Sequence, residues 1–332
     1  MRKPGVWGGC GIQRLAGLLL ALALPLLPAC RQDDSTISVP VSDWPGYEYF
    51  YLAHQLGLDR SLGITINPLL FPDPQAIVHA YLRGQIPLAQ LTTVEVVDIC
   101  ARDHKRCPVV VLVLNESRGG DRIAVVDAVP SLKDLKGRSV AVTYSTLGPY
   151  VLSRALEKKG LRLSDVQLRN IPLSEMPNAL KAGEVDAAVF FPPYSDYAAR
   201  DGGSRVLFDS QDIPGEVFDV LAVDPAYLKK HPARLVSLVK AWSAAHLEAD
   251  RQPEKAIGLM ARRERLSVQE FRQSEQGLVY FPLVQQQEML APKGLLARNL
   301  QAVKAVQVRL GLLPADSPLP EVSSRSVREA LP

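Results

Sequence analysis

Short apolar runs alternate along this chain with segments whose apolar residues recur at helical spacing. In the stretch 137–194, an apolar run at 139–143 is followed by a polar turn and then by an amphipathic segment over 151–159. A helix end, Gly183 and a second apolar run up to Val189 come next, and Gly in that place is typical of a helix C-terminus. Repeated strand, loop and helix units predict a mostly parallel sheet with helices on its faces. The fold class expected from this pattern is α/β.

The pattern extends through the rest of the chain. Thr92 and Glu95 have the spacing of a capping box and predict a helix start directly after an apolar run. Beyond Pro232 the apolar residues keep helical spacing, up to a last helix near 295–312. The Pro- and Ser-rich segment 314–332 is expected to form a loosely docked C-terminal tail. Further strands are expected at 37–41, 63–70, 109–114, 122–126, 205–208 and 217–223.

Several short motifs, taken in order, make the chain recognisable. They are Trp44-Pro45-Gly46-Tyr47, Gly119-Gly120-Asp121, the run 137–142 with Ser145-Thr146 after it, and the run 180–188. Together they resemble the nitrate/sulfonate/taurine group of ABC-transporter substrate-binding proteins, over roughly residues 37–240. The resemblance implies the type II periplasmic-binding-protein fold, in which two α/β domains are joined by two hinge strands. These hinge strands are expected near 122–130 and 205–223.

The resemblance also implies a domain arrangement and a function. Domain I is expected to be discontinuous, at 37–124 and 220–313, and domain II is expected at 125–219. The two domains would close over a small solute, and an ABC permease in the inner membrane would receive it. A partner ATPase would supply the energy, so no cofactor is expected in this chain.

Residues 1–29 have the composition of a secretory signal peptide. They contain three basic residues, no acidic residue and an apolar run at 15–27. Leu27-Pro28-Ala29-Cys30 resembles a bacterial lipobox, so Cys30 is expected to carry the lipid, with 30–36 as a polar tether. The alternative is an uncleaved anchor helix, but the apolar run is shorter than the ~18–20 residues that a membrane span needs. The expected location is the periplasmic side of a bacterial membrane, with inner or outer membrane left open.

Removing this segment changes the charge of the chain. It takes three of the 38 Lys and Arg residues, which leaves 35 against 35 Asp and Glu, so the formal net charge of the remainder is zero. A neutral chain without a basic patch in its sequence does not favour nucleic-acid binding.

Two cysteines remain to be explained, Cys100 and Cys107. Because an exported protein folds in an oxidising compartment, a disulfide between them is expected. The alternative is a metal site that includes His104, but the sequence offers no fourth ligand and no close C-x-x-C pair. No metal is therefore expected.

Four polar loops follow expected strands and precede expected helices, at 43–47, 92–94, 145–149 and 191–194. In a two-domain α/β fold such junctions face one cleft, and ligands bind outside the carboxyl ends of the strands. The alternative is local: Thr92 and Thr146 would only cap helices, and Trp44 would only pack between domains. The candidate ligand-binding residues, from these loops and the elements beside them, are Asp43, Trp44, Tyr47, Thr92, Thr93, Asp121, Ser145, Thr146, Tyr150, Phe191 and Asp219.

Two kinds of solute fit these residues. Helix N-termini and hydroxyl groups suit an anion such as a sulfonate, a carboxylate or nitrate. Asp121 and Asp219 between aromatic side chains suit an amine or a ring N–H, as in a heteroaromatic vitamin precursor. The sequence leaves both open.

Catalysis is the competing class of function. The sequence has no G-x-S-x-G, no Walker loop and no H-E-x-x-H, and its five histidines have no evident partners. Enzymes of thiamine-pyrimidine synthesis share the expected fold, but the Cys-rich motif that marks them is absent here. The chain is therefore expected not to be an enzyme, and an accessory or sensory binding lipoprotein without transport is the other alternative.

Overall fold

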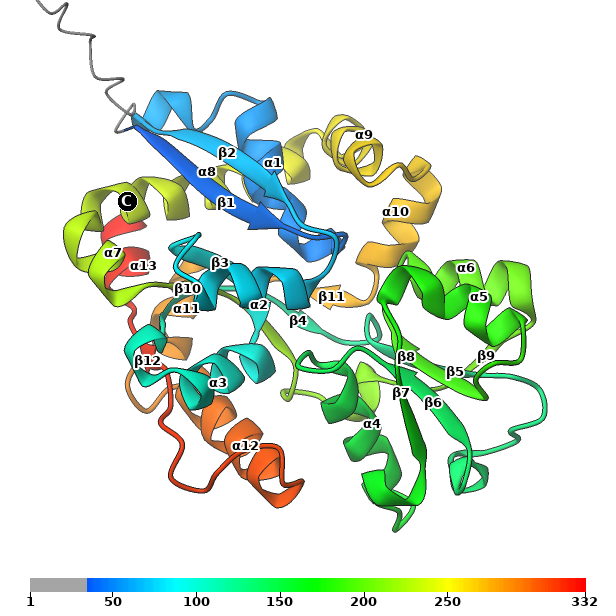
Figure 1. Ribbon diagram of the computed structural model, residues 1–332. Coiled ribbons are helices and arrows are strands. Elements are labelled where there is room, and N and C mark those ends of the chain that lie inside the picture. Colours follow the sequence, from blue (N-terminus) through cyan, green and yellow to red (C-terminus); the bar gives the residue numbers. More distant parts are fainter. Residues whose placement is uncertain (1–34) are drawn as a thin grey trace, which may run out of the picture. The chain divides into compact units, whose positions relative to one another are not determined.

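The computed structural model describes residues 35–332, which form a compact unit of their own (Figure 1). The predicted signal peptide, Cys30 and most of the predicted tether lie outside the described residues. Within 35–332, no helix combines the length and the apolar character that crossing a membrane requires.

The strands fall into two groups in space. One group holds the parallel pair β1 (Thr36–Val41) and β2 (Thr65–Leu70), and a sheet in the order β11-β4-β10-β3, with β12 beside β4. The other group is a sheet in the order β7-β6-β8-β5-β9, drawn in green in Figure 1. The strands of these two sheets are β3 (Leu88–Thr92), β4 (Val109–Ser117), β5 (Arg122–Val125), β6 (Ser139–Val142), β7 (Gln167–Asn170), β8 (Ala187–Phe190), β9 (Arg205–Asp209), β10 (Phe218–Val223), β11 (Leu278–Val279) and β12 (Glu321–Val322).

The chain passes between the two groups twice, through 118–121 after β4 and through 210–217 before β10. We call residues 35–117 and 218–332 the first lobe and residues 122–209 the second lobe. The domain boundaries proposed from the sequence, at 124/125 and 219/220, stay predictions. Both sheets are mixed, because β10 runs antiparallel to β3 and β4, and β5 runs antiparallel to β8 and β9. The strands of the stretch 137–194 pair in parallel as predicted, since β6 runs parallel to β7 and to β8. The first-lobe sheet differs from that pattern, because β4, β10, β3 and β11 pair in antiparallel.

Helices cover the sheets of both lobes. Thr92 caps α3 with the expected capping box, in which Glu95 bonds back to the Thr92 backbone N–H. In the first lobe, α3 packs against α12 and α1 packs against α8. The helices are α1 (Glu48–Gln55), α2 (Pro74–Leu82), α3 (Thr93–Arg102), α4 (Gly148–Glu157), α5 (Met176–Lys181), α6 (Tyr194–Gly202), α7 (Pro225–Lys230), α8 (Pro232–Arg251), α9 (Pro253–Glu264), α10 (Val268–Glu275), α11 (Leu283–Met289), α12 (Leu295–Arg309) and α13 (Arg325–Ala330).

The C-terminal segment is part of the first lobe. Glu321 and Val322 of β12 pair in parallel with β4, and Val327 of α13 is fully buried. The expectation of a loosely docked tail was wrong, because its few apolar residues are spaced so that they pack on β4 and α8.

Cys100 and Cys107 are joined by a disulfide in the structure. The bond links the last turn of α3 to the start of the segment that enters β4. It therefore ties a helix beside the cavity described below to the central strand of the first lobe.

Candidate ligand-binding site

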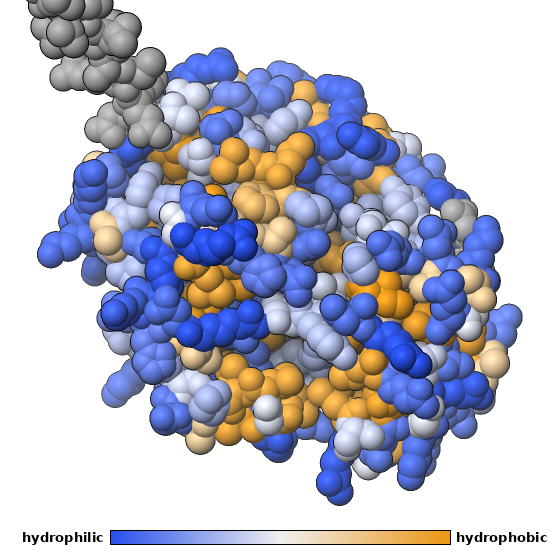
Figure 2. Space-filling view, viewed as in Figure 1, coloured by the Kyte–Doolittle hydropathy of each residue, from blue (hydrophilic) through white to orange (hydrophobic). Residues whose placement is uncertain are grey.

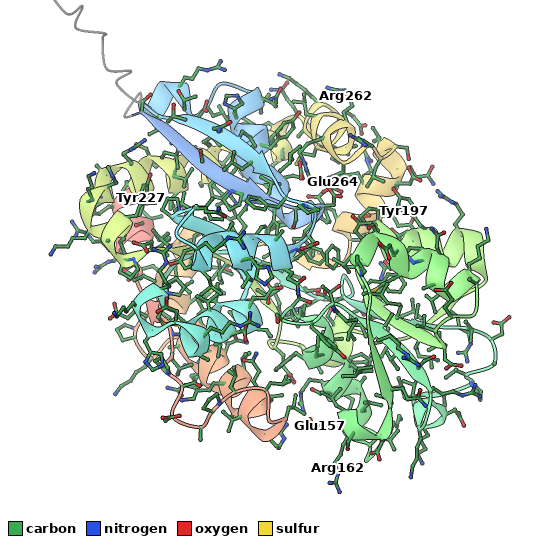
Figure 3. All side chains as sticks on the ribbon, in the orientation of Figure 1. Glu157, Arg162, Tyr197, Tyr227, Arg262 and Glu264 are labelled. Atoms are coloured by element: carbon green, nitrogen blue, oxygen red, sulfur yellow. A yellow bond between two sulfur atoms is a disulfide. The ribbon has the colours of Figure 1, made fainter. Side chains whose placement is uncertain are left out.

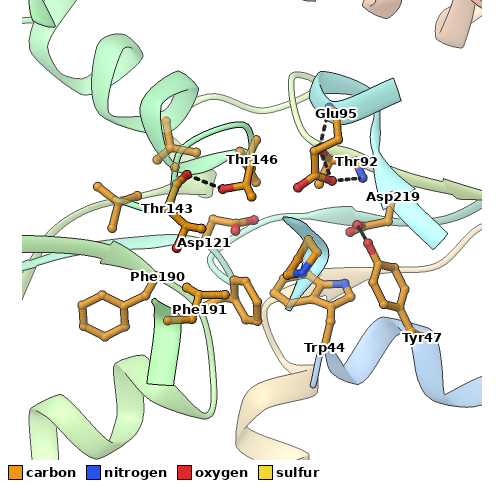
Figure 4. A pocket seen from close by; sticks show the side chains of 16 residues that line it. Trp44, Tyr47, Thr92, Glu95, Asp121, Thr143, Thr146, Phe190, Phe191 and Asp219 are labelled. Atoms are coloured by element: carbon orange, nitrogen blue, oxygen red, sulfur yellow. Dashed lines mark hydrogen bonds between the residues drawn. The ribbon is translucent and has the colours of Figure 1, made fainter. Parts of the chain in front are cut away.

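A cavity lies between the two lobes, and residues of both lobes line it (Figure 4). Its unfilled volume is about 530 Å³, including solvent at its mouth. Each of the four loops predicted to face a cleft contributes at least one wall residue. The lining residues are Trp44, Tyr47, Pro74, Thr92, Glu95, Asp121, Thr143, Thr146, Leu147, Gly148, Val151, Leu173, Val189, Phe190, Phe191 and Asp219.

An aromatic pair from opposite lobes forms one wall. The Trp44 and Phe191 rings meet edge to face, with their centroids 5.2 Å apart, and Trp44 is only 4% exposed. The loop that carries Trp44 lies tightly against β4, because a Cβ on Gly46 would come within 2.1 Å of Asn115 Nδ2. Gly46 therefore allows the close approach that sets the position of Trp44.

Three carboxyl groups face the same space, those of Glu95, Asp121 and Asp219 (Figure 4). The Tyr47 hydroxyl donates to Asp219 Oδ1 at 2.6 Å. This hydrogen bond joins the segment that precedes α1 to β10. Glu95 Oε2 accepts from the backbone N–H of Thr92 at 2.8 Å. Asp121 follows the Gly119-Gly120 loop, where its backbone N–H donates to Ser117 Oγ at 3.2 Å.

Burial raises the pKa of all three carboxyl groups. The pKa of Glu95 rises to about 7, mainly through loss of solvent, although the Thr92 hydrogen bonds partly oppose the shift. The pKa of Asp121 rises to about 6 for the same reason, against the lowering effects of Ser117 and Arg122. Burial also raises the pKa of Asp219 well above its usual range, while the Tyr47 hydroxyl lowers it.

Two of the threonine hydroxyls expected to bind a ligand, those of Thr92 and Thr146, are already engaged within the protein. Thr146 Oγ1 donates to the Thr143 carbonyl at 2.7 Å. Thr92 Oγ1 lies 3.2 Å from Glu95 Oε2, to which it donates within the capping box. The interpretation of Thr92 as a helix cap is confirmed, and both residues still line the cavity.

Seven of the eleven candidate residues line this cavity, and four do not: Asp43, Thr93, Ser145 and Tyr150. Asp43 accepts from the Tyr194 hydroxyl at 3.1 Å, and Thr93 is buried in the first lobe. The Tyr150 hydroxyl donates to Glu216 at 2.8 Å. Ser145 has a left-handed backbone (φ 63°) and accepts from Arg102 Nη2 at 2.5 Å.

Ser145 and Tyr150 line a neighbouring groove instead, with an unfilled volume of about 880 Å³ including open solvent. The groove shares Glu95 and Thr146 with the cavity, so the two spaces meet at these side chains. Leu312, which is 46% exposed, lies on its first-lobe side. Figure 2 shows apolar side chains gathered in this region of a mostly hydrophilic face.

Sequence reasoning missed one carboxyl group and most of the apolar wall of the cavity. Glu95 was recognised only as a capping residue, although its position one turn after a strand end was a usable indication of a cleft residue. The other lining residues outside the candidate set come from strand ends and helix starts: Pro74, Thr143, Leu147, Gly148, Val151, Leu173, Val189 and Phe190.

Polar contacts hold the lobes against each other around the cavity. Gln75 Nε2 donates to the Tyr144 carbonyl at 2.7 Å. On the far side of the groove, Arg309 Nη2 lies 2.6 Å from Glu157 Oε1, which Figure 3 marks at the end of α4 near α12. A third contact, the Asp43–Tyr194 hydrogen bond, lies beside Trp44. The two lobes are therefore in direct contact around the cavity.

The chain is similar in sequence to two proteins of Escherichia coli (strain K12) that are named as binding proteins. The chain is 29% identical over 212 residues to a protein named as an aliphatic sulfonates-binding protein in Escherichia coli (strain K12), covering 63% of this chain and 66% of the relative. It is 24% identical over 194 residues to the taurine-binding periplasmic protein of the same organism, covering 57% of this chain and 58% of the relative. The matched stretches thus span 66% and 58% of these relatives, which is less than two thirds of each.

The fold has a close structural counterpart in the alkanesulfonate-binding protein of Xanthomonas axonopodis pv. citri, solved with MOPS bound. The TM-score is 0.70 at 19% identity, and the match covers 84% of this chain and 94% of that protein. The fold is thus that of periplasmic binding proteins, as expected. Residues 43–261, which include the cavity's first-lobe loops and the whole second lobe, match the model of the NMT1-like family. The chain belongs to the NMT1-like family.

Proposed function

We propose that this chain is an extracytoplasmic solute-binding protein that captures a small solute between its lobes and delivers it to an ABC permease in the inner membrane. In this proposal Cys30 carries the lipid anchor, and the protein works on the periplasmic side of a bacterial membrane. The candidate binding residues are the seven that line the cavity, joined by Glu95.

One observation carries the proposal: the cavity is walled by both lobes, and its aromatic pair, Trp44 and Phe191, comes one from each. A solute in such a cavity contacts both lobes only when they are closed. Its binding therefore favours the closed form by its differential affinity. A permease that recognises the closed form would thereby distinguish loaded from empty protein.

The names of the relatives support this function. The proteins named above bind sulfonates or taurine, so a sulfonate, taurine or nitrate-like solute is one candidate class, and a heteroaromatic vitamin precursor is the other. An accessory or sensory protein would use the same cavity without a permease. An enzyme of pyrimidine synthesis would convert the molecule that it binds.

The test is independent of solute class. Purified residues 35–332 are dialysed to equilibrium against a small-molecule extract of the source cells, and the solutes enriched on the protein side are identified by mass spectrometry. We expect one or a few small solutes to be enriched, and Trp44→Ala to abolish the enrichment. No enrichment by a folded sample would contradict the proposed function, and a chemically altered product would favour the enzyme.

A further inference from the structure

The cavity also indicates which solute class it accepts, an inference that rests on the proposed function. We propose that the solute is a small organic cation, in which a protonated amine, amidine or nitrogen heterocycle with N–H donors is carried on a flat apolar body. The sequence left open an anion and a solute with an amine or ring N–H, and the cavity favours the second.

The walls of the cavity are acidic. Three carboxyl groups line the cavity, and no Lys, Arg or His is among its lining residues. Glu95 and Asp219 are each 2% exposed and Asp121 is 6% exposed, so bulk water does not screen them well. A sulfonate or nitrate in this space would be desolvated beside acids without a cation to pair with, which is unfavourable.

The nearest guanidinium is directed elsewhere. Arg122 follows Asp121 directly, but its Nε donates to the Gly119 carbonyl at 2.9 Å and its Nη1 lies 2.6 Å from Asp196. These bonds direct it to the connecting segment 118–121 and to α6. It lowers the pKa of Asp121 without lining the cavity.

Asp219 carries an acceptor atom that lacks a donor within the described residues. Asp219 Oδ1 receives the Tyr47 hydroxyl, but Oδ2 is buried and has no hydrogen-bond partner among residues 35–332. Trp44 Nε1 lies near enough to lower the pKa of Asp219, yet it too lacks a partner of proper geometry in that range. A buried acceptor left without a donor is costly, and a ligand N–H would satisfy it.

Helix N-termini do not reverse this balance. The start of α4 reaches the cavity through Leu147 and Gly148, and a helix N-terminus carries roughly +0.5 of an elementary charge. Three carboxyl groups outweigh it even when one is protonated. The hydroxyls of Thr92 and Thr146, which could have served an anion, donate to acceptors within the protein.

The apolar part of the cavity wall suits a flat apolar ligand body. Trp44 and Phe191 lie beside the carboxyl groups, and Leu147, Val151 and Leu173 add aliphatic surface (Figure 4). Aromatic faces attract organic cations through the negative face of the ring, and the attraction is stronger where the site is desolvated. A metal ion fits less well, because no group of three His, Cys, Asp or Glu side chains in the described part of the chain is placed to hold one.

The experiment uses residues 35–332 and matched probes of similar size and opposite charge. The cations are 4-aminopyridine and benzamidine, the anions are benzenesulfonate and benzoate, and binding is measured by calorimetry at about pH 8, up to probe concentrations where a dissociation constant of about 1 mM is resolved. The variants are Asp121→Asn and Asp219→Asn, and the matched control is Glu184→Gln, an exposed acid on the second lobe. Asn keeps the shape of Asp, and Asp121→Asn provides a readout if Asp219→Asn fails to fold.

We expect at least one cation to bind, and Asp121→Asn to weaken it at least tenfold while Glu184→Gln leaves it unchanged. Tighter binding of benzenesulfonate or benzoate would overturn the solute class and leave the solute-binding function standing. Binding of no probe would also overturn the class. The dialysis against the cell extract then tests the solute-binding function separately. Enrichment of an anionic solute would support that function, and no enrichment would contradict it.

Discussion

The Tyr47 hydroxyl donates a 2.6 Å hydrogen bond to Oδ1 of Asp219, across 172 positions of the sequence. Tyr47 ends the loop that carries Trp44, and Asp219 lies on β10, which follows the second passage between the lobes. The bond therefore ties one wall of the cavity to the strand beside the second connection.

Replacing Tyr47 by Phe leaves the Asp219 carboxyl without its donor. Both residues are buried, so we expect Tyr47→Phe to lower the free energy of unfolding by about 1–3 kcal/mol. Urea unfolding of residues 35–332 measures the loss. The control is Tyr144→Phe, since that side chain is 42% exposed and should change stability little. Equal effects of the two substitutions would show that the Tyr47–Asp219 bond is not stabilising.

Trp44→Ala removes the first-lobe half of the aromatic contact between the lobes. We expect it to weaken binding of the enriched solute at least tenfold, because the solute loses a wall and the closed form loses its contact with Phe191. Calorimetry measures the affinity, and circular dichroism checks that the variant is folded. Leu247→Ala, at a side chain that is 54% exposed, is the control. Unchanged affinity in a folded Trp44→Ala variant would contradict the placement of the site.

Raised pKa values make both stability and binding depend on pH. Burial raises the pKa of Glu95 to about 7 and that of Asp121 to about 6, so the folded protein retains protons that the unfolded chain has lost. Their contribution to the free energy of unfolding is complete below about pH 4 and is lost as the pH rises through 6 and 7. The charges facing them are Asp98 near Glu95, Arg122 near Asp121, and Asp219 between them.

Binding of a cation has the opposite pH dependence, since it needs ionised carboxylates. We expect the affinity for benzamidine, which stays protonated throughout, to fall at least tenfold between about pH 8 and pH 5.5. Calorimetry at the two pH values measures it. Glu95→Gln should make the affinity for benzamidine depend less on pH. Affinity that is constant with pH would mean that these carboxyl groups do not contact the ligand.

The Cys100–Cys107 disulfide closes a short loop at the end of α3. The non-reduced protein should show no alkylated thiol at either position by mass spectrometry. Replacing both residues by Ser should lower the free energy of unfolding by about 2 kcal/mol, the amount expected from closing so short a loop. Two free thiols in the exported protein would contradict the bond.

The Arg309–Glu157 ion pair links the lobes at an exposed place, since the Arg309 side chain is 55% exposed. Solvent screens such a pair, so Arg309→Gln should change the affinity for the enriched solute less than about threefold, corresponding to under about 1 kcal/mol. The small difference should vanish in about 1 M salt. An effect as large as that of Trp44→Ala would mean that this pair, and not the aromatic contact, controls closure.

The sequence by itself determined the local structure near the cavity. The capping box of Thr92 and Glu95 starts α3 where the spacing predicted it, because the side chain that satisfies each free N–H lies only three residues away. The apolar run 139–143 forms β6 nearly as expected. Each of these features depends on neighbours within a few residues.

Only the tertiary structure decided which side chains share the cavity. Ser145 and Tyr150, both from the predicted polar turn, line the neighbouring groove, whereas Glu95 joins Asp121 and Asp219. The docking of α13 and the antiparallel direction of β10 likewise depend on residues far away in the sequence, so local patterns did not predict them. The physical reason is that hydrophobic burial and pairing of distant polar groups select among folds with equal local structure, and hydrophobic periodicity reports only that an element has a buried face.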